Sequence, residues 1–400
     1  MNPQKILIFS TAYCPFVGGA EVAVKEITDR IVDTQFDLIT AKLDRKLPSI
    51  EKIGNINVYR VGFGFKTLDK LWLALFGHRK AAKLYKEKKY DVVWSMMASQ
   101  ASIAAAKFKI KESKPKLILT MQEGDEEEHL KRYVLGVNFL YRWLIKPLHL
   151  LVFQKADFGT AISNYLIERM RKNGVDVPIE LIPNGVDINK FEIRNSKSEI
   201  EERKKIRQEL ELKEGDIVLV TSSRLVKKNG VGDVIHALTK LSENIKFLIL
   251  GEGYLEESLK LKAKSLKVSD RVIFMGLVSH QSLPKYLKAC DIFIRASLSE
   301  GFGVSFIEAM AAKLPVIATP VGGITDFLFS PAKLMCSGID AIATGYFCEP
   351  ENPESIVSTV QKVISDPNKN QIIENAYKMV KEKYDWDLIA KQMSAVFNIK

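Results

Sequence analysis

The chain has 400 residues, and at about 150 residues per domain this length predicts two or three domains rather than a single hydrophobic core. Hydrophobic residues make up 46% of the chain and charged residues 27%, which excludes a disordered chain, a collagen-like chain and a polytopic membrane protein. The 59 Lys and Arg residues exceed the 48 Asp and Glu residues by 11, and this surplus indicates an anionic partner: nucleic acid, anionic lipid or a phosphorylated ligand.

The basic surplus is concentrated in the first half of the chain. Residues 1–188 contain 29 basic and 21 acidic side chains, which accounts for +8 of the net charge of +11. Within this half, residues 60–90 carry nine Lys or Arg residues against only Asp69 and Glu87, and a second basic run covers 107–116. The charge is therefore local and not spread evenly over the chain.

The four cysteines are dispersed and form no C-x-x-C pair: Cys14, Cys290, Cys336 and Cys348. This spacing predicts neither a zinc site nor a disulfide framework, and it fits a reducing cytosol. We expect no signal peptide, because the N-terminal apolar run covers only 5–10. The longest apolar stretch, 133–153, contains Arg142, Lys146 and Pro147 and is not expected to span a bilayer.

Short β-branched runs alternate along the chain with amphipathic stretches, which is typical of parallel α/β layers. In the first half, strands are expected at 5–10, 35–40, 56–61, 91–95, 116–121 and 157–162. Helices are expected near 19–32, 68–88, 99–110, 130–154 and 163–173. Residues 179–187 are expected to form a strand that runs into a tight turn, and 192–215 a connecting segment with a surface helix.

The second half repeats this rhythm. Strands are expected at 216–222, 245–250, 271–275, 291–295 and 315–319. Helices are expected near 231–242, 254–267, 282–289, 304–313, 354–366 and 369–383. Two Rossmann-like halves joined near 185–215 are the simplest architecture, and in such sheets ligands bind outside the carboxyl ends of the strands.

Glycine-rich loops follow two of the expected strands. Gly18 and Gly19 precede a helix, where close backbone approach and unpaired N–H groups suit an anion. A tight turn without a ligand explains that pair nearly as often. Gly251 and Gly253 form a second loop that allows close approach.

Residues 221–230 follow the first strand of the second half and contain Arg224, Lys227 and Lys228 beside Gly230. Arginine offers a planar fork and lysine a point charge, which together suit a diphosphate leaving group. Solvated surface charge is the alternative for this segment taken alone.

The segment 297–310 carries the strongest signal. A strand ends, two glycines bracket Phe302, and a helix is expected from about Val304. Glu300 precedes that helix, and Glu308 lies just over one turn inside it. Carboxylates so placed can each accept a pair of vicinal hydroxyls, one from a sugar and one from a ribose, while the helix N–H groups can take a phosphate.

Taken in order, these motifs resemble the retaining GT-B glycosyltransferases of the GT4 type, the glycosyl transferases group 1 family. The resemblance is carried by Gly18-Gly19, Arg224 with Lys228, Gly251-Glu252-Gly253, Glu300 and Glu308 with seven residues between them, and Val321-Gly322-Gly323. It implies an α/β protein with two Rossmann-like domains facing each other across a cleft. The acceptor domain would cover 1–188 plus 385–400, and the nucleotide-sugar domain 189–384.

The resemblance also implies a role for each matching residue. Glu308 would hold the ribose hydroxyls, Glu300 would contact the transferred sugar, and Arg224 with Lys228 would neutralise the diphosphate. Arg224, Lys228 and Glu300 are thus the implied catalytic residues, with the base near 271–274. The other implied substrate contacts are Gly18, Gly19, Gln122, Gly251, Gly253, Ile273, Phe302, Gly303 and Val304.

The implied reaction moves a hexosyl unit from a nucleotide-diphosphate sugar to a sugar or lipid-linked glycan acceptor in cell-surface polysaccharide or glycolipid synthesis. Breaking the anomeric C–O bond builds positive charge on the sugar and negative charge on the diphosphate, which fixed cations and helix N–H groups stabilise. The departing phosphate would take the acceptor's proton on the same face, giving retention. No Asp-x-Asp sits in a position that suggests a metal-dependent alternative, so neither a metal ion nor a cofactor is expected.

Three positions depart from the family's pattern. Asn229 stands where the family usually has its phosphate lysine, so Lys228 or its neighbour would have to reach the diphosphate. Gln122 stands where the family often has a His-Asp pair, and the nearby His129 follows three glutamates and is expected to be solvated. Asp326 stands where a glutamate is commoner.

The basic stretches 68–84 and 133–153 mix Lys and Arg with Leu, Phe and Trp. In an acceptor domain they fit an anionic inner-leaflet surface, which predicts a cytoplasmic protein peripheral to the membrane. A packed amphipathic helix with a solvated basic face is the alternative for each stretch.

Other functions stay open as alternatives. A catalytically weak, sugar-nucleotide-binding regulatory relative is suggested by Gln122 and Asn229, but Glu300, Glu308 and Arg224 are all present. A sugar-nucleotide 2-epimerase would need an acid/base pair around C2, and the sequence offers no convincing one. Nucleic-acid binding is not expected, because there is no motif for it and no interleaved aromatic platform.

Overall fold

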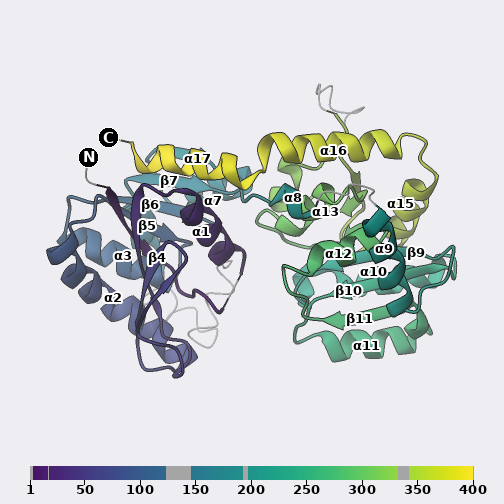
Figure 1. The fold of residues 1–400 in the computed structure, drawn as a ribbon, viewed down its shortest axis with the longest axis horizontal. Coiled ribbons are helices and arrows are strands. Elements are labelled where there is room, and N and C mark those ends of the chain that lie inside the picture. The colour runs from purple at the N-terminus through teal and green to yellow at the C-terminus, as the bar shows by residue number, and fades with distance from the viewer. Residues whose placement is uncertain (1–2, 17, 123–145, 192–196, 332–341, 400) are drawn as a thin grey trace. The chain divides into compact units, whose positions relative to one another are not determined.

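The computed structural model describes residues 3–16, 18–122, 146–191, 197–331 and 342–399. The chain divides into two compact units (Figure 1). The N-terminal unit comprises Met1–Asn184 with Trp386–Lys400, and the C-terminal unit comprises Gly185–Asp385. The expected boundaries, after 188 and before 385, lie within four residues of these.

The N-terminal unit is built on an eight-stranded sheet in the order β3-β4-β2-β1-β5-β6-β7-β8. Neighbouring strands are parallel except for β3 and β4, which pair antiparallel. The strands are β1 (Gln4–Phe9), β2 (Thr34–Ala41), β3 (Ile50–Ile53), β4 (Ile56–Val61), β5 (Val92–Met96), β6 (Lys116–Met121), β7 (Phe158–Ala161) and β8 (Ile179–Leu181).

Helices cover both faces of this sheet, because alternate residues of each buried strand point to opposite sides. The helices are α1 (Gly19–Arg30), α2 (Lys66–Lys88), α3 (Gln100–Lys111), α6 (Lys146–Gln154), α7 (Asn164–Lys172) and α17 (Trp386–Phe397). Ile6 and Ile8 of β1 pack with α1 and α17, whereas Leu7 and Phe9 pack with α2 and α3 on the other face (Figure 1). The C-terminal helix α17 therefore completes the core of the first unit.

The C-terminal unit is built on a six-stranded parallel sheet in the order β11-β10-β9-β12-β13-β14. The strands are β9 (Ile217–Ser222), β10 (Ile245–Leu250), β11 (Val272–Gly276), β12 (Ile292–Arg295), β13 (Val316–Ala318) and β14 (Tyr346–Phe347). The α-helices are α8 (Ile188–Phe191), α9 (Lys197–Glu209), α10 (Val231–Ala237), α11 (Glu256–Ser265), α12 (Leu283–Ala289), α13 (Val304–Ala311), α15 (Pro353–Ser365) and α16 (Lys369–Lys383). The 3₁₀ turns are η3 (Lys227–Asn229), η4 (Leu238–Lys240), η5 (Ser269–Arg271) and η6 (Gly322–Asp326).

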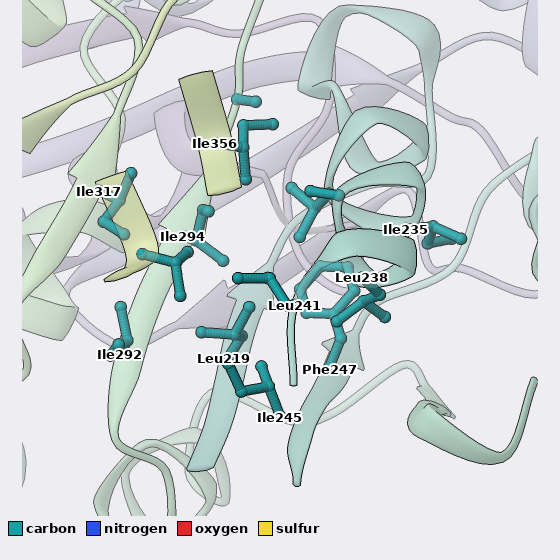
Figure 2. Packing of buried hydrophobic residues seen from close by; sticks show 14 of the residues in the cluster. Leu219, Ile235, Leu238, Leu241, Ile245, Phe247, Ile292, Ile294, Ile317 and Ile356 are labelled. Atoms are coloured by element: carbon teal, nitrogen blue, oxygen red, sulfur yellow. The ribbon is translucent and has the colours of Figure 1, made fainter. Parts of the chain in front are cut away.

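A continuous apolar core lies on one face of this second sheet. Leu219, Phe247 and Ile294, from three neighbouring strands, belong to one buried cluster with Ile235 of α10 and Ile356 of α15 (Figure 2). Each of these side chains is fully buried. The core fixes the strands and so fixes the loops that leave their carboxyl ends.

The expected α/β class with two parallel, Rossmann-like sheets is confirmed. Two strands, β3 and β14, were not expected, because these edge strands of four and two residues are too short to show a clear alternation. The expected helix 231–242 is α10 followed by the 3₁₀ turn η4. Of the expected helix 130–154, α6 is seen, and 130–145 lies outside the described residues.

Three further properties concern the whole of the described chain. Among the described residues, no helix is long and apolar enough to cross a membrane. The same residues contain no group of three or more His, Cys, Asp or Glu side chains placed to hold a metal ion. Cys14, Cys290 and Cys348 are free thiols, and Cys336 lies outside the described residues.

Candidate active site

The strand order of the C-terminal unit reverses between β9 and β12. Strands β10 and β11 are added on one side of β9. The chain then crosses back, and β12, β13 and β14 are added on the other side of β9. Ligands of parallel α/β sheets bind at such a reversal, beside the carboxyl ends of the two strands. Two loops start there, 223–230 after β9 and 296–303 after β12. They carry Arg224, Lys228 and Glu300, the three predicted catalytic residues.

The two loops are joined by backbone contacts. The N–H of Leu298 donates a hydrogen bond of 2.7 Å to the carbonyl of Lys228. Gly230 has a φ of 64°, and a Cβ there would stand 1.8 Å from the carbonyl oxygen of Ala296. Only glycine fits at this position, and Gly230 therefore allows the loop that carries Arg224 and Lys228 to pack against the loop that carries Glu300.

Buried contacts support the loop that carries Arg224. The side chain of Asn229 is buried, and its Nδ2 donates to the carbonyl of Arg224 at 2.7 Å. Asn229, at the position where the family usually has a lysine, is therefore a structural anchor of this loop. The Arg224 side chain itself is exposed and that of Lys228 is half-buried.

The predicted substrate contacts Gly251 and Gly253 pack beneath the same loop. A Cβ on Gly251 would stand 2.0 Å from the carbonyl oxygen of Ser223, and one on Gly253 would stand 2.4 Å from that of Leu225. The N–H of Leu225 donates to the carbonyl of Glu252 at 2.9 Å. The visible role of the two glycines is thus to let the loop after β10 approach the Arg224 loop closely.

Glu300 is held by Arg295, a residue that the sequence analysis missed. Arg295 is the last residue of β12, and its side chain is only 7% exposed. Its Nη2 forms an ion pair with Oε2 of Glu300. The other carboxylate oxygen, Oε1, accepts the N–H of Gly301 at 3.1 Å. The carboxylate is therefore oriented from two sides.

The remaining guanidinium contacts of Arg295 tie it to the surrounding backbone segments. Nε donates to Oγ of Ser297 at 3.1 Å and Nη1 donates to Oγ of Ser305 at 2.9 Å. The guanidinium carbon lies 4.4 Å from the centroid of the Phe306 ring. The available signal was a single arginine in the apolar run 292–296, five residues before Glu300.

The backbone of Glu300 is supported by a third loop. Gly322 has a φ of 53°, and a Cβ there would stand 1.9 Å from the carbonyl oxygen of Glu300. The N–H of Gly323 donates to the same oxygen at 3.1 Å. The glycine pair after β13 therefore packs against the backbone of the Glu300 loop and supports it.

Helix α13 begins at the end of the Glu300 loop. Gly303 precedes it with a φ of 94°, and a Cβ there would stand 2.5 Å from the ring of Phe306. The first N–H groups of a helix favour an anion, and in α13 the third of them, that of Phe306, already donates to the carbonyl of Gly303 at 3.0 Å. Phe302 is buried, with its ring 5.4 Å from that of Phe327. A substrate contact by Phe302 would thus fall to its backbone.

Glu308 lies one turn inside α13 with its side chain 7% exposed. Its Oε1 lies 2.7 Å from Nε2 of His280, in the loop after β11. The imidazole therefore orients the carboxylate that was predicted to hold the ribose. His280 was missed, because an isolated histidine in a polar loop gives no sequence signal.

Residues 271–274 were expected to lie near the nucleotide base of the donor, and the structure shows a structural role for the first of them. Arg271 is buried at the amino end of β11, the edge opposite to the Arg224 and Glu300 loops. Its guanidinium donates to the carbonyls of Leu238 and Ser242, each at 2.8 Å. The side chain of Arg271 therefore holds the amino edge of the sheet and is not available to a base, whereas Ile273 is half-buried within β11.

In the N-terminal unit, Gly18 and Gly19 lead into α1 as predicted. The N–H of Gly18 donates to Oε2 of Glu21 at 2.8 Å, and burial raises the pKa of that carboxyl. Among the described residues, no atom other than those of its chain neighbours and of the backbone of its own helix lies within 4 Å of the place a Cβ on Gly19 would take. This leaves room for a ligand against the backbone.

Gln122, predicted to contact a sugar, is buried at the carboxyl end of β6. It forms a reciprocal amide pair with Asn184: its Nε2 donates to Oδ1 of Asn184 at 2.9 Å, and its Oε1 accepts from Nδ2 of Asn184 at 2.7 Å. This pair holds the turn after β8 to the end of β6. His129 lies outside the described residues.

The structure thus gathers one group of predicted residues within the C-terminal unit. Arg224, Lys228, Glu300, Gly303, Val304 and Glu308 all belong to the loops and the helix that start at the carboxyl edge of this sheet. Gly18, Gly19 and Gln122 belong to the N-terminal unit.

Comparison with family models accounts for most of the chain. The model described as "Glycosyl transferases group 1" matches residues 202–379, and the model described as "Glycosyltransferase Family 4" matches residues 17–190. The two matches fall on the C-terminal and N-terminal units, respectively.

Individual proteins extend the similarity to the full length. An uncharacterised glycosyltransferase of Methanocaldococcus jannaschii is 28% identical over 99% of this chain and 98% of its own. An alpha-monoglucosyldiacylglycerol synthase of Streptococcus pneumoniae is 25% identical over 79% of this chain and 71% of its own. Among solved structures, sucrose-phosphate synthase from Thermosynechococcus elongatus superposes with a TM-score of 0.79 at 17% identity, each chain covering 98% of the other. Anabaena HepE, solved with UDP and glucose, gives a TM-score of 0.72 at 20% identity, with 98% of this chain and 99% of HepE covered.

Proposed function

Because the chain belongs to the GT4-type glycosyltransferases of the glycosyl transferases group 1 family, we propose that it moves a hexosyl unit from a nucleotide-diphosphate sugar to a sugar or lipid-linked glycan. The transfer proceeds with retention at the anomeric carbon and without a metal ion. The observation that supports this most is the site at the reversal between β9 and β12. Cations, a helix N-terminus and two oriented carboxylates start there from one edge of one sheet.

Each group at this edge suits one part of the donor. Arg224 and Lys228 neutralise the diphosphate, together with the first N–H groups of α13. Glu308, one turn inside the helix and fixed by His280, accepts the ribose hydroxyls. Glu300, fixed by Arg295, accepts hydroxyls of the transferred sugar.

The reaction follows from the charges that form in it. The bond between the anomeric carbon and the diphosphate oxygen breaks, and its electron pair leaves with the diphosphate. The acceptor oxygen forms the new bond on the same face, and its proton passes to the departing phosphate oxygen. In this proposal Arg224, Lys228 and the helix N–H groups offer positive charge before the negative charge develops, which is the condition for electrostatic catalysis.

The acceptor is proposed to be lipid-linked or part of a cell-surface polysaccharide, handled at the cytoplasmic face of a membrane. The relatives support this class: besides the pneumococcal glycolipid synthase, they include a lipopolysaccharide 1,2-N-acetylglucosaminetransferase and a phosphatidylinositol mannoside mannosyltransferase. The basic surplus of the first half suits such an anionic surface.

The donor is identified by thermal unfolding against UDP-, GDP- and ADP-sugars. A ligand that binds only the native state raises Tm, and at about a hundred times Kd the stabilisation is about 2.7 kcal/mol. We expect one nucleotide series to raise Tm. Hydrolysis of that donor, even if slow, would identify an enzyme, whereas a binding-only relative would not hydrolyse it. NMR of the anomeric proton in the product then tests retention. A panel with no Tm shift would count against the proposal.

A further inference from the structure

The N-terminal end of α2 and the loop before it expose large apolar side chains. Six of them are between 39% and 63% exposed: Phe63, Phe65, Leu68, Leu71, Trp72 and Leu75. In the described part of the chain they make up a third of the eighteen exposed large hydrophobic side chains, although they occupy only thirteen residues. We call these six residues the α2 surface.

The helical members of the α2 surface lie on one face. Leu68, Leu71, Trp72 and Leu75 follow the spacing i, i+3, i+4, i+7, which places them side by side along the helix. The Trp72 ring lies 5.0 Å from the ring of Phe63, so the preceding loop belongs to the same cluster. The other face of α2 packs into the core of the unit, so the helix carries two apolar faces and exposes one of them.

The segment that carries this surface is basic, and the nearest acidic residue from another segment is the half-buried Asp44, which pairs with Phe65 in an isolated β-bridge. Between Glu51 and Glu87 the only acidic residue is Asp69, and Asp69 is fully buried. Its Oδ1 accepts the N–H of Phe63 at 2.9 Å and its Oδ2 that of Phe65 at 2.7 Å. The Asp69 carboxylate thus binds the backbone of the loop and does not face solvent.

The cations lie among the apolar side chains. Lys66 and Arg79 are exposed on α2, and the guanidinium of Arg45 lies 4.1 Å from the centroid of the Phe65 ring. Aromatic and aliphatic side chains interleaved with Lys and Arg are the composition that binds the boundary between lipid headgroups and acyl chains.

We propose that the α2 surface docks the N-terminal unit on an anionic lipid bilayer. The apolar side chains enter the headgroup boundary, while Lys66, Arg79 and Arg45 meet the acidic headgroups. A second copy of the chain fits less well, because a two-fold contact through this surface would bring like charges together. The inference deepens the proposed function, since a lipid-linked acceptor lies in such a bilayer, but docking itself needs neither donor nor acceptor.

The test is co-sedimentation of the full chain with vesicles of phosphatidylcholine, alone or mixed with phosphatidylglycerol, at low salt. We expect binding only to the mixed vesicles, weakened by added salt because the cations are at the surface. The double variant Leu71→Ser/Trp72→Ser should lose most of the binding, and Lys66→Gln/Arg79→Gln should lose about fivefold for each cation. The matched control is Leu261→Ser/Lys378→Gln, which removes a leucine 67% exposed and a lysine side chain 77% exposed in the C-terminal unit and should bind as the wild type does.

Trp72 fluorescence supplies a second readout that does not depend on sedimentation. Anionic vesicles should shift the wild-type emission to the blue, and Trp72→Phe should lose that shift while retaining binding. Failure of the wild type to bind mixed vesicles, or equal binding by the α2 and control variants, would overturn the proposal. So would self-association without vesicles that Leu71→Ser/Trp72→Ser abolishes, which would assign the surface to a dimer. Donor binding in the thermal panel is scored separately, so the failure of one proposal is distinguishable from the failure of the other.

Discussion

The guanidinium of Arg295 forms an ion pair with the carboxylate of Glu300, five residues further along the chain, at the carboxyl end of strand β12. Both side chains are largely buried, at 7% and 15% exposure. A buried charge is tolerated when its partner and its hydrogen bonds are in place, and removing one partner leaves the other uncompensated. Arg295 is therefore a positioning residue for the carboxylate that we propose holds the sugar.

The substitution Arg295→Met should lower both stability and transfer. The unpaired Glu300 carboxylate should cost about 3 kcal/mol in the free energy of unfolding, and its displacement should lower kcat about 100-fold. Binding of the nucleoside diphosphate alone should change little, because Arg295 acts at the sugar end of the site. Urea unfolding, steady-state kinetics and calorimetric titration measure the three quantities.

Two further variants separate positioning from a general structural role. Arg295→Lys should recover part of kcat, and the double variant Arg295→Met/Glu300→Gln should recover stability without recovering transfer. Equal losses of affinity for the nucleotide and for the nucleotide-sugar in Arg295→Met would show that the residue merely supports the fold.

Lys228 and Lys227 offer a matched pair for the diphosphate. Lys228 is half-buried and its carbonyl accepts the N–H of Leu298, whereas Lys227 is exposed. Lys228→Met should lower kcat/KM about 100-fold, as expected when one group that stabilises the developing charge is lost. Lys227→Met should lower it by less than about threefold, in the range of an exposed charge. The opposite order would assign the diphosphate to Lys227.

His280 is expected to act on donor binding through Glu308. Loss of the hydrogen bond in His280→Ala should raise KM for the donor about fivefold, equivalent to about 1 kcal/mol, with kcat nearly unchanged. His236→Ala, at an exposed position of α10, is the control. A fall in kcat at constant KM would instead connect His280 with the chemical step.

The sequence predicted the larger elements well because their signals are local. The strand at 116–121 and the helix at 369–383 coincide with β6 and α16, since long apolar or amphipathic runs carry a clear period. The glycine spacing also pointed to the loops at the β9 and β12 ends. Partners formed by tertiary packing could not be predicted in this way. In the sequence Arg295 is an isolated charge in a strand, and its partner Glu300 is brought to it only by the fold of the following loop. Gln122 likewise pairs with Asn184, which is 62 residues away in the sequence.

We expect His78 to make the stability of the fold depend on pH. It is buried in α2, and burial together with the positive charges of Lys111, Lys107 and Arg79 lowers its pKa from the ordinary 6.5. The unfolded chain therefore takes up a proton at a higher pH than the folded chain does. The stability is fully present above pH 6.5 and is lost as the pH falls through the lowered pKa of the folded state. His78→Gln should flatten this part of the profile in urea unfolding, and an unchanged slope in the variant would exclude His78 as its source.

The central claim is that the β9–β12 edge transfers a sugar from a nucleotide-sugar. The most direct measurement is release of nucleoside diphosphate from UDP-, GDP- and ADP-sugars by the wild type, Glu300→Ala and Arg224→Ala, with circular dichroism to verify that each variant is folded. We predict that the wild type turns over one donor series and that both folded variants lose turnover by at least about 100-fold. Normal turnover in the two folded variants, or no turnover of any donor by the wild type, would contradict the account.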